Sequence, residues 1–145
     1  MYHGTDTIIT AVDLNKSRLR TDFGKGFYLS SKLGVAHNWA VDKSGATKIP
    51  IIMRFTLNTT KLNTPELLVL RFDQPTVEWL DFIRGNRQIK AIPGVSGEPR
   101  HNYDVVSGPI ATLLLSACLL LLYSSLALHH HLIAFCSNSN MQRLY

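Results

Sequence analysis

Two short segments near the amino terminus carry side chains that together could bind a nucleoside. One is His3-Gly4-Thr5, and the other is the segment 26–30, Gly-Phe-Tyr-Leu-Ser. A histidine can donate a hydrogen bond to a ribose hydroxyl, a glycine backbone can bind a carboxamide, and a tyrosine ring can stack on a flat heterocycle. If neighbouring strands bring them together, they suit a nicotinamide riboside. A surface histidine and a core tyrosine without a ligand is the alternative that these residues leave open.

The glycines before Tyr28 predict the backbone conformation that leads into this residue. Gly24 and Gly26 come directly before the aromatic run, which predicts a tight backbone turn leading into an aromatic strand. We expect Asp22 to fix this turn by accepting hydrogen bonds from backbone amides. The segment 22–31 is therefore interpreted as a turn followed by a sheet strand.

Periodicity predicts the elements that surround this strand. A helix is expected over 32–41, with Ser30 or Ser31 as its cap and Trp39 in the core. Pro75 predicts the first turn of a second helix that ends at Gly85. The inward residues of that helix are expected to be Val77, Leu80 and Ile83. Sheet strands are expected at 51–57, 67–72 and 103–106.

Length and composition limit the domain organisation and the class of protein. A chain of 145 residues can bury one hydrophobic core but not two ordinary ones, so 1–145 is expected to be a single domain. A hydrophobic content of 46% excludes general disorder. The net charge of +5 permits attraction to phosphate, but no run of Lys and Arg indicates a nucleic-acid surface. Charged residues throughout 1–25 are unlike a secretory signal, so a cytoplasmic location is expected.

The carboxy-terminal part has a different composition. All Asp, Glu, Lys and Arg residues except Arg143 lie in the first 104 positions. The leucine-rich segment 110–128 is long enough to nearly cross a bilayer core of about 30 Å. Its serines and the lack of flanking Lys or Arg disfavour a membrane anchor, and a buried helix stays an alternative. The histidines at 129–131 point in different directions on any regular element, so we predict no metal site.

Residues 1–111 resemble a bacterial family of ADP-ribosyltransferase-like proteins long catalogued as a domain of unknown function. The matching segments are YHGT at 2–5, DLNKS at 13–17, DFGKGFYLS at 22–30, WA at 39–40, WLDFI at 79–83, NR at 86–87 and YDVVSGPIA at 103–111. The resemblance implies an α+β fold, namely a split antiparallel β-sandwich with a few helices that grips NAD between its sheets.

The resemblance also implies roles for individual residues. His3 would hold the adenosine-side ribose, the Gly4 backbone would meet the nicotinamide amide, and the Tyr28 ring would stack on nicotinamide. The other members of the implied NAD-binding set are Thr5, Gly26 and Ser30. NAD would be the substrate, and its ADP-ribose would pass to a macromolecule, either protein or nucleic acid, with release of nicotinamide. A toxin-like protein of this kind can have a neutralising partner.

The chain departs from the family pattern after residue 111. The segment 132–137 resembles the last family strand, yet Leu132 stands where the family has a glutamine that contacts the nicotinamide ribose. An aliphatic side chain cannot make that hydrogen bond. An active transferase and a catalytically impaired NAD-binding or interaction protein are therefore both open, with 110–145 as a divergent tail. Both hypotheses require His3 and Tyr28, the expected catalytic pair, to close around one dinucleotide from neighbouring strands.

Overall fold

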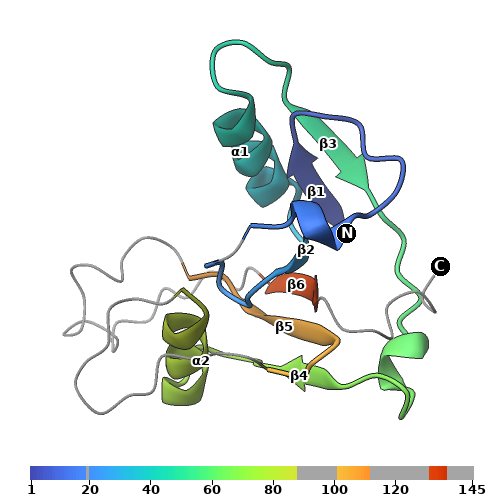
Figure 1. Ribbon diagram of the computed structural model, residues 1–145, viewed down its shortest axis with the longest axis vertical. Helices are drawn as coiled ribbons and strands as arrows, with labels where there is room; N and C mark the ends of the chain where they lie inside the picture. Colours follow the sequence, from blue (N-terminus) through green and yellow to red (C-terminus); the bar gives the residue numbers. More distant parts are fainter. Residues whose placement is uncertain (19, 88–100, 112–130, 137–145) are drawn as a thin grey trace.

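The computed structural model describes residues 1–18, 20–87, 101–111 and 131–136 (Figure 1). Most of the leucine-rich segment 110–128, together with His129 and His130, lies outside the described residues. The elements in chain order are β1 (Tyr2–Thr5), the 3-10 helix η1 (Leu14–Lys16), β2 (Gly26–Ser30), α1 (Leu33–Ser44), β3 (Ile51–Arg54), the 3-10 helix η2 (Lys61–Asn63), β4 (Val69–Arg71), α2 (Val77–Arg87), β5 (Val105–Pro109) and β6 (His131–Cys136).

The described strands form one six-stranded sheet in the order β3-β1-β2-β6-β5-β4. With two helices beside this sheet, the α+β class is confirmed. Each neighbouring pair is antiparallel except β4 and β5, which are parallel. The expectation of an antiparallel sheet is wrong for that pair. The physical reason is that α2 lies between these strands in the chain, and such a crossover returns the chain to the same edge of the sheet.

The sheet is joined weakly between β1 and β2. These strands share a single residue pair, Tyr2 with Ser30, whereas β1 and β3 share four pairs and β2 and β6 share five. Figure 1 shows β1 and β3 beside α1, and β4, β5 and β6 nearer α2. The described strands thus make one sheet that opens between β1 and β2, and they do not form two separate stacked sheets.

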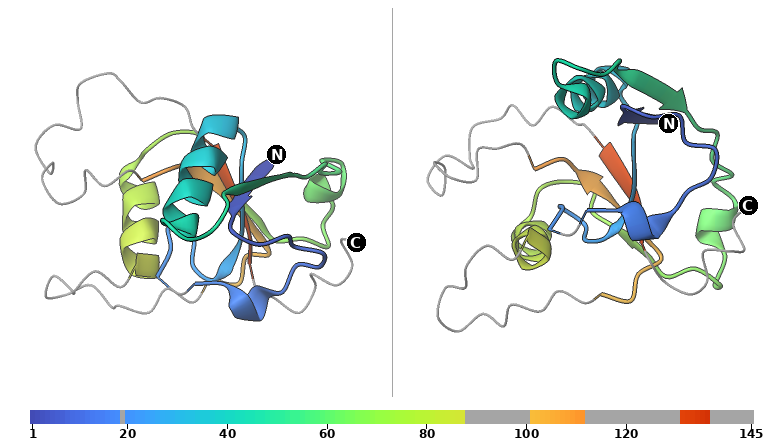
Figure 2. Two further views of the ribbon diagram at one scale, coloured as in Figure 1. Left: turned by 90° about the horizontal axis from the view of Figure 1, so that it is seen from above. Right: turned by 45° about the horizontal axis from the view of Figure 1, so that its top comes forward.

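Side chains on the two faces of the sheet form two hydrophobic clusters. The face covered by α2, here called the α2 face, carries the cluster of Phe23, Trp79, Ile83, Val106, Ala111, Leu132, Ala134 and Cys136. The other face, here called the open face, carries Leu29, Val105 and Phe135, with partly buried neighbours that include Phe27 and Ile133. Figure 2 shows α1 and α2 as two separate helices packed beside the strands.

The α1 helix confirms one prediction and corrects two. It begins at Leu33 and extends to Ser44, so the helix expected over 32–41 is confirmed. Its N-cap is Lys32, whose ammonium cannot accept a hydrogen bond from the helix amides, and Ser30 accepts one from the Lys32 amide rather than capping the helix. Trp39 is 47% exposed rather than in the core. The buried residues of α1 include Ala36 and Ala40, whose small side chains let the helix approach β1 closely.

The other predicted elements form near their expected positions. The strands expected at 51–57, 67–72 and 103–106 correspond to β3, β4 and β5. The second helix is confirmed as α2, where Ile83 is fully buried, but the prediction that Val77 faces the core is wrong, because this residue is 71% exposed in the first turn. The helix continues past Gly85 to Arg87 because the side chains of its last turn have partners elsewhere in the domain.

Candidate nucleotide site around His3 and Tyr28

The imidazole of His3 bridges the place where β1 and β2 separate. Its Nδ1 lies 2.7 Å from the backbone oxygen of Tyr28, and its ring stacks on Phe27 with a centroid distance of 4.4 Å. A carbonyl oxygen only accepts hydrogen bonds, so Nδ1 carries the proton. In the neutral ring Nε2 is then an acceptor, and it has no hydrogen-bond partner among the described residues.

The surroundings of His3 keep this imidazole neutral. Burial lowers the pKa of His3 below its ordinary value of 6.5, the hydrogen bond to Tyr28 acts in the opposite direction, and the charge of Lys43 lowers the pKa further. At neutral pH, Nε2 therefore accepts rather than donates. The sequence-based expectation that His3 donates to a ribose hydroxyl is corrected in direction, because the hydroxyl would have to donate to His3.

We expect acid to destabilise the domain partly through His3. Between the ordinary pKa of 6.5 and the lower folded-state pKa, the unfolded chain binds a proton that the folded protein does not. The stabilising contribution is present above pH 6.5 and is lost as pH falls through that window. Urea unfolding at about pH 7.5 and about pH 5.5 should show a smaller loss of stability in His3→Gln than in the unmodified protein. Equal losses in both proteins would contradict this prediction.

The hydroxyl of Tyr28 is used to hold the glycine turn together. It accepts a hydrogen bond from the Phe23 amide at 3.0 Å, donates to the Gly24 carbonyl at 2.6 Å, and lies 2.7 Å from Thr21 Oγ1. Burial of the phenol raises the pKa of Tyr28, so the hydroxyl stays protonated. Tyr28 thus performs the turn-fixing role that the sequence assigned to Asp22.

Tyr28→Phe removes the hydroxyl and keeps the ring, so it measures the contribution of the hydroxyl to stability on its own. The variant leaves the Phe23 amide without its acceptor, so the free energy of unfolding should fall by about 1–3 kcal/mol. The aromatic ring stays in place, so its packing against the cluster of the α2 face should be retained. Urea denaturation measures the loss. Tyr2→Phe is the matched control, since the Tyr2 hydroxyl has no hydrogen-bond partner in the described part of the chain. Equal stability of both variants would contradict the assignment.

The His3 side chain contacts the backbone of Tyr28, but the side chains of the two residues face different ways. Phe27, against which the His3 ring stacks, belongs to the open face, whereas the Tyr28 ring packs against the cluster of the α2 face. Successive residues of a strand point to opposite faces, which accounts for this separation. The expectation that both rings close around a ligand on one face is therefore wrong.

The other predicted ligand residues are buried. Gly4 and Thr5 form the last two pairs of the β1 and β3 ladder, and a Cβ on Gly4 would lie 1.9 Å from the Ala36 oxygen. A Cβ on Gly26 would lie 2.7 Å from the Phe135 oxygen of β6. Glycine is required at both positions for close packing. Whether these residues also contact NAD stays a prediction.

One polar network that sequence reasoning did not find ties the glycine turn to distant elements. Asp22 accepts hydrogen bonds from Arg87, at 2.7 Å from Nε, and from the Ala111 amide at 3.1 Å. Arg87 also donates to the Ala111 carbonyl, and Asn86 donates to the Asp22 carbonyl. Of the two roles that sequence allowed for Arg87, a phosphate contact or a structural pair, the structure supports the pair. The signal was that all these residues lie within matching segments of the resemblance.

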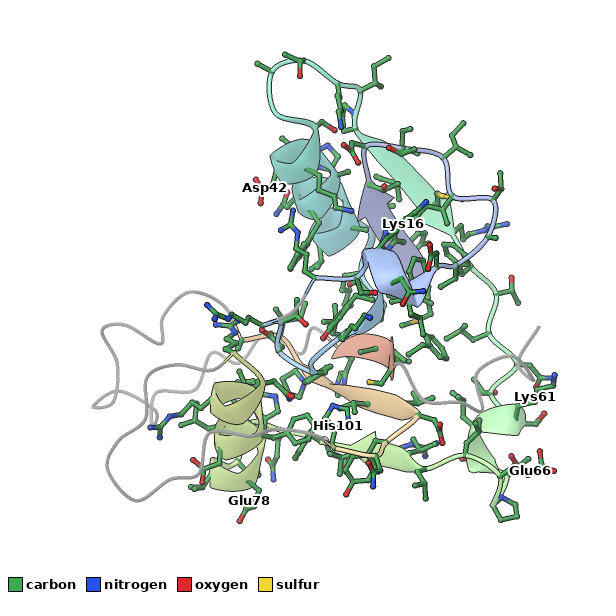
Figure 3. All side chains as sticks on the ribbon, viewed as in Figure 1. Lys16, Asp42, Lys61, Glu66, Glu78 and His101 are labelled. Carbon is green, nitrogen blue, oxygen red and sulfur yellow. The ribbon has the colours of Figure 1, made fainter. Side chains whose placement is uncertain are left out.

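Leu132 occupies a central position in the sheet. It pairs with Ser30 of β2 and with Gly108 of β5, is 5% exposed, and packs in the cluster of the α2 face. The carboxylate of Glu78 does not replace the missing polar group, because it projects outward from α2 (Figure 3). At this position the domain has an aliphatic core residue.

The family model described as "Protein of unknown function (DUF3990)" matches residues 1–142. The chain belongs to this family. The match includes the leucine-rich segment, which lies beyond the motifs of the resemblance. No curated protein and no solved structure matches this DUF3990 chain.

The described residues of the DUF3990 chain contain neither a membrane-spanning helix nor a metal-binding cluster. None of their helices is long and apolar enough to cross a membrane. No cluster of three or more His, Cys, Asp or Glu side chains with the geometry of a metal site occurs among them. The single described cysteine, Cys136, is buried and has a pKa raised to about 12, first by burial and then by the charge of Asp104.

Proposed function

We propose that this DUF3990 protein is an ADP-ribosyltransferase-type domain that binds NAD and transfers ADP-ribose to a macromolecular acceptor, with release of nicotinamide. The observation that supports the proposal most directly is the His3 imidazole. It lies where the β1 and β2 ladder ends, and its Tyr28 hydrogen bond leaves Nε2 as an acceptor for a ribose hydroxyl. The resemblance of residues 1–111 to ADP-ribosyltransferase-like proteins supplies the identity of the dinucleotide.

The orientation of the two aromatic groups determines how NAD would bind. Since His3 and Tyr28 serve opposite faces of one sheet, the proposed NAD site uses the His3 side of the β1 and β2 junction only. A ribose hydroxyl would donate to Nε2 of His3, whereas the Tyr28 ring, packed in the cluster of the α2 face, would not stack on nicotinamide. As nicotinamide leaves, positive charge develops on C1′ of the nicotinamide ribose in an oxocarbenium-like transition state. The site must therefore orient this ribose and stabilise the positive charge. His3 can orient the ribose.

A binding protein without turnover is the second candidate, and Leu132 is the observation that favours it. The family glutamine at this position would contact the nicotinamide ribose, and a buried leucine cannot. This candidate keeps NAD binding and loses the transfer step. Calorimetry for binding and release of labelled nicotinamide for turnover therefore distinguish the two candidates.

The test of the NAD site uses the complete chain and one matched pair of variants. His3→Ala should weaken NAD binding by roughly tenfold, the effect expected for loss of one strong hydrogen bond to the ligand. His37→Ala is the control, because His37 lies exposed on α1. Circular dichroism must show that both variants are folded. No NAD binding by the unmodified chain, or equal binding by His3→Ala, would remove the proposed site.

The acceptor is sought with labelled NAD. The pure chain is incubated with NAD labelled in the adenosine part and with a whole-cell lysate, and protein and nucleic acid are then separated. Label retained in either fraction identifies the class of acceptor. NAD binding without retained label or released nicotinamide would favour the second candidate.

Leu132→Gln is expected to have two effects. The buried amide should lower the free energy of unfolding by about 2 kcal/mol, because the Leu132 side chain packs among apolar residues. If the missing amide alone blocks turnover, nicotinamide release should appear in the variant. Leu132→Met is the matched control, since it preserves volume without a strong hydrogen-bonding group. Turnover in the unmodified chain would instead show that Leu132 does not prevent transfer.

A further inference from the structure

A cavity of about 300 Å³ lies on the open face, away from His3 and Tyr28. Val69 and Arg71 of β4, Val105 and Ser107 of β5, and Ile133 of β6 contribute to its lining. In the sheet order, β2 lies between these strands and β1, where His3 lies. The cavity is therefore distinct from the proposed NAD site.

The cavity has an apolar end and a polar end. Val69 pairs with Val105, and two residues further along the parallel ladder Arg71 pairs with Ser107. Because residues two apart share a face, both pairs line the same cavity. A ligand lying along β4 and β5 would therefore meet aliphatic side chains at one end and a cation beside a hydroxyl at the other.

The Arg71 side chain is held at the polar end by the neighbouring 3-10 helix. Its Nη2 donates to Asn63 Oδ1 at 2.8 Å and to the Leu62 oxygen at 3.4 Å, and both residues also line the cavity. Arg71 has no carboxylate partner in the described ranges of the chain. Arginine presents its donors in a planar fork that matches a carboxylate. The η2 contacts thus position a guanidinium that has no counter-ion among the described residues.

We propose that this cavity binds a small organic anion, with its carboxylate on Arg71 and Ser107 and its compact apolar body over Val69 and Val105. The volume lies at the lower limit of small-molecule sites, so the cavity suits a ligand smaller than a dinucleotide. The aliphatic end favours an organic anion over a free inorganic one, because burial of the ligand body removes apolar surface from water.

The test uses benzoate as the probe and the complete chain. Ligand-observed NMR should detect saturable benzoate binding that is roughly tenfold weaker in Arg71→Gln. Arg54→Gln is the matched control, because Arg54 is an exposed arginine on β3 at the other edge of the sheet. Ser107→Ala should weaken binding by a smaller factor, and it gives a second measurement should Arg71→Gln prove unfolded by circular dichroism.

Two further probes distinguish the contribution of the ligand's charge from that of its apolar body. Benzyl alcohol lacks the charge and inorganic phosphate lacks the apolar body, so both should bind roughly tenfold or more weakly than benzoate. Benzoate affinity should be unchanged in His3→Ala, which distinguishes this site from the NAD site. The proposal is overturned by unsaturable benzoate binding, by equal affinities of a folded Arg71→Gln and the unmodified chain, or by either partial probe binding as tightly as benzoate.

Discussion

Gly4→Ala is expected to lower the free energy of unfolding by about 3 kcal/mol or more, a large part of the stability of an ordinary domain. A Cβ at this position would lie 1.9 Å from the Ala36 oxygen and 2.7 Å from the Ala40 nitrogen. Both are backbone atoms of α1, so no side-chain rotation relieves the overlap. The helix would have to move away from β1. Urea denaturation followed by circular dichroism measures the loss.

Gly34→Ala is the matched control for this prediction. Gly34 lies in α1, and a Cβ there has no atom within 4 Å among its described surroundings. Alanine also favours the helix by up to about 1 kcal/mol. The same chemical change should therefore be neutral or stabilising at Gly34 and strongly destabilising at Gly4. A Gly4→Ala protein as stable as the unmodified chain would show that α1 does not pack closely on β1.

The close packing of Gly4 also determines how the NAD site can be tested. Loss of NAD binding in Gly4→Ala would report displacement of α1 and would not isolate a contact with nicotinamide. His3 is the better probe, because its Nε2 has no partner among the described residues. Variants of His3 therefore test the ligand, while variants of Gly4 and Tyr28 test the fold.

The second large effect is expected at Arg87. Arg87→Ala should lower the free energy of unfolding by about 2–3 kcal/mol, because it leaves the largely buried Asp22 carboxylate without its charged partner. The partial exposure of Arg87 keeps the expected loss below that of a fully buried pair. The Ala111 amide remains as a partner of Asp22. Chemical denaturation at neutral pH gives the difference.

Arg84→Ala provides the control within the same helix. Arg84 pairs with the exposed Asp81 at 3.7 Å, and such surface pairs contribute between zero and about 1 kcal/mol. If truncation of Arg84 and Arg87 cost the same, the network that joins the glycine turn, α2 and Ala111 would not stabilise the domain. A double variant with Asp22→Asn tests the coupling, since the loss from Arg87→Ala should shrink when the carboxylate is absent.

Local patterns predicted the regular elements well. Apolar spacing and Pro75 indicated α1 and α2, and β-branched runs indicated β3, β4 and β5. These signals are local in the chain, so they do not depend on which elements later meet. The observed ends of the elements differ from the predicted ends, because contacts with residues far away in the sequence determine where each element stops. The continuation of α2 through Asn86 and Arg87, which bind Asp22, is an example.

Contacts between distant segments could not be predicted from the same patterns. Trp39 has apolar neighbours in sequence, but the narrow space between α1 and β1 accepts only small residues such as Ala36. His3 and Tyr28 were expected together, and the His3 imidazole does contact the backbone oxygen of Tyr28. Which face each side chain occupies depends on the pairing of β1 with β2, and a one-residue change of register would reverse it.

The position of β6 has a consequence for biosynthesis. This strand, residues 131–136, lies between β2 and β5 and pairs with both. A ribosome makes the chain from its amino terminus, so the two flanking strands emerge before the strand that joins them. Until then each exposes an unpaired edge that can join with another nascent chain. Completion of the sheet is therefore a late event, and a chaperone that shields strand edges would improve the yield of folded protein.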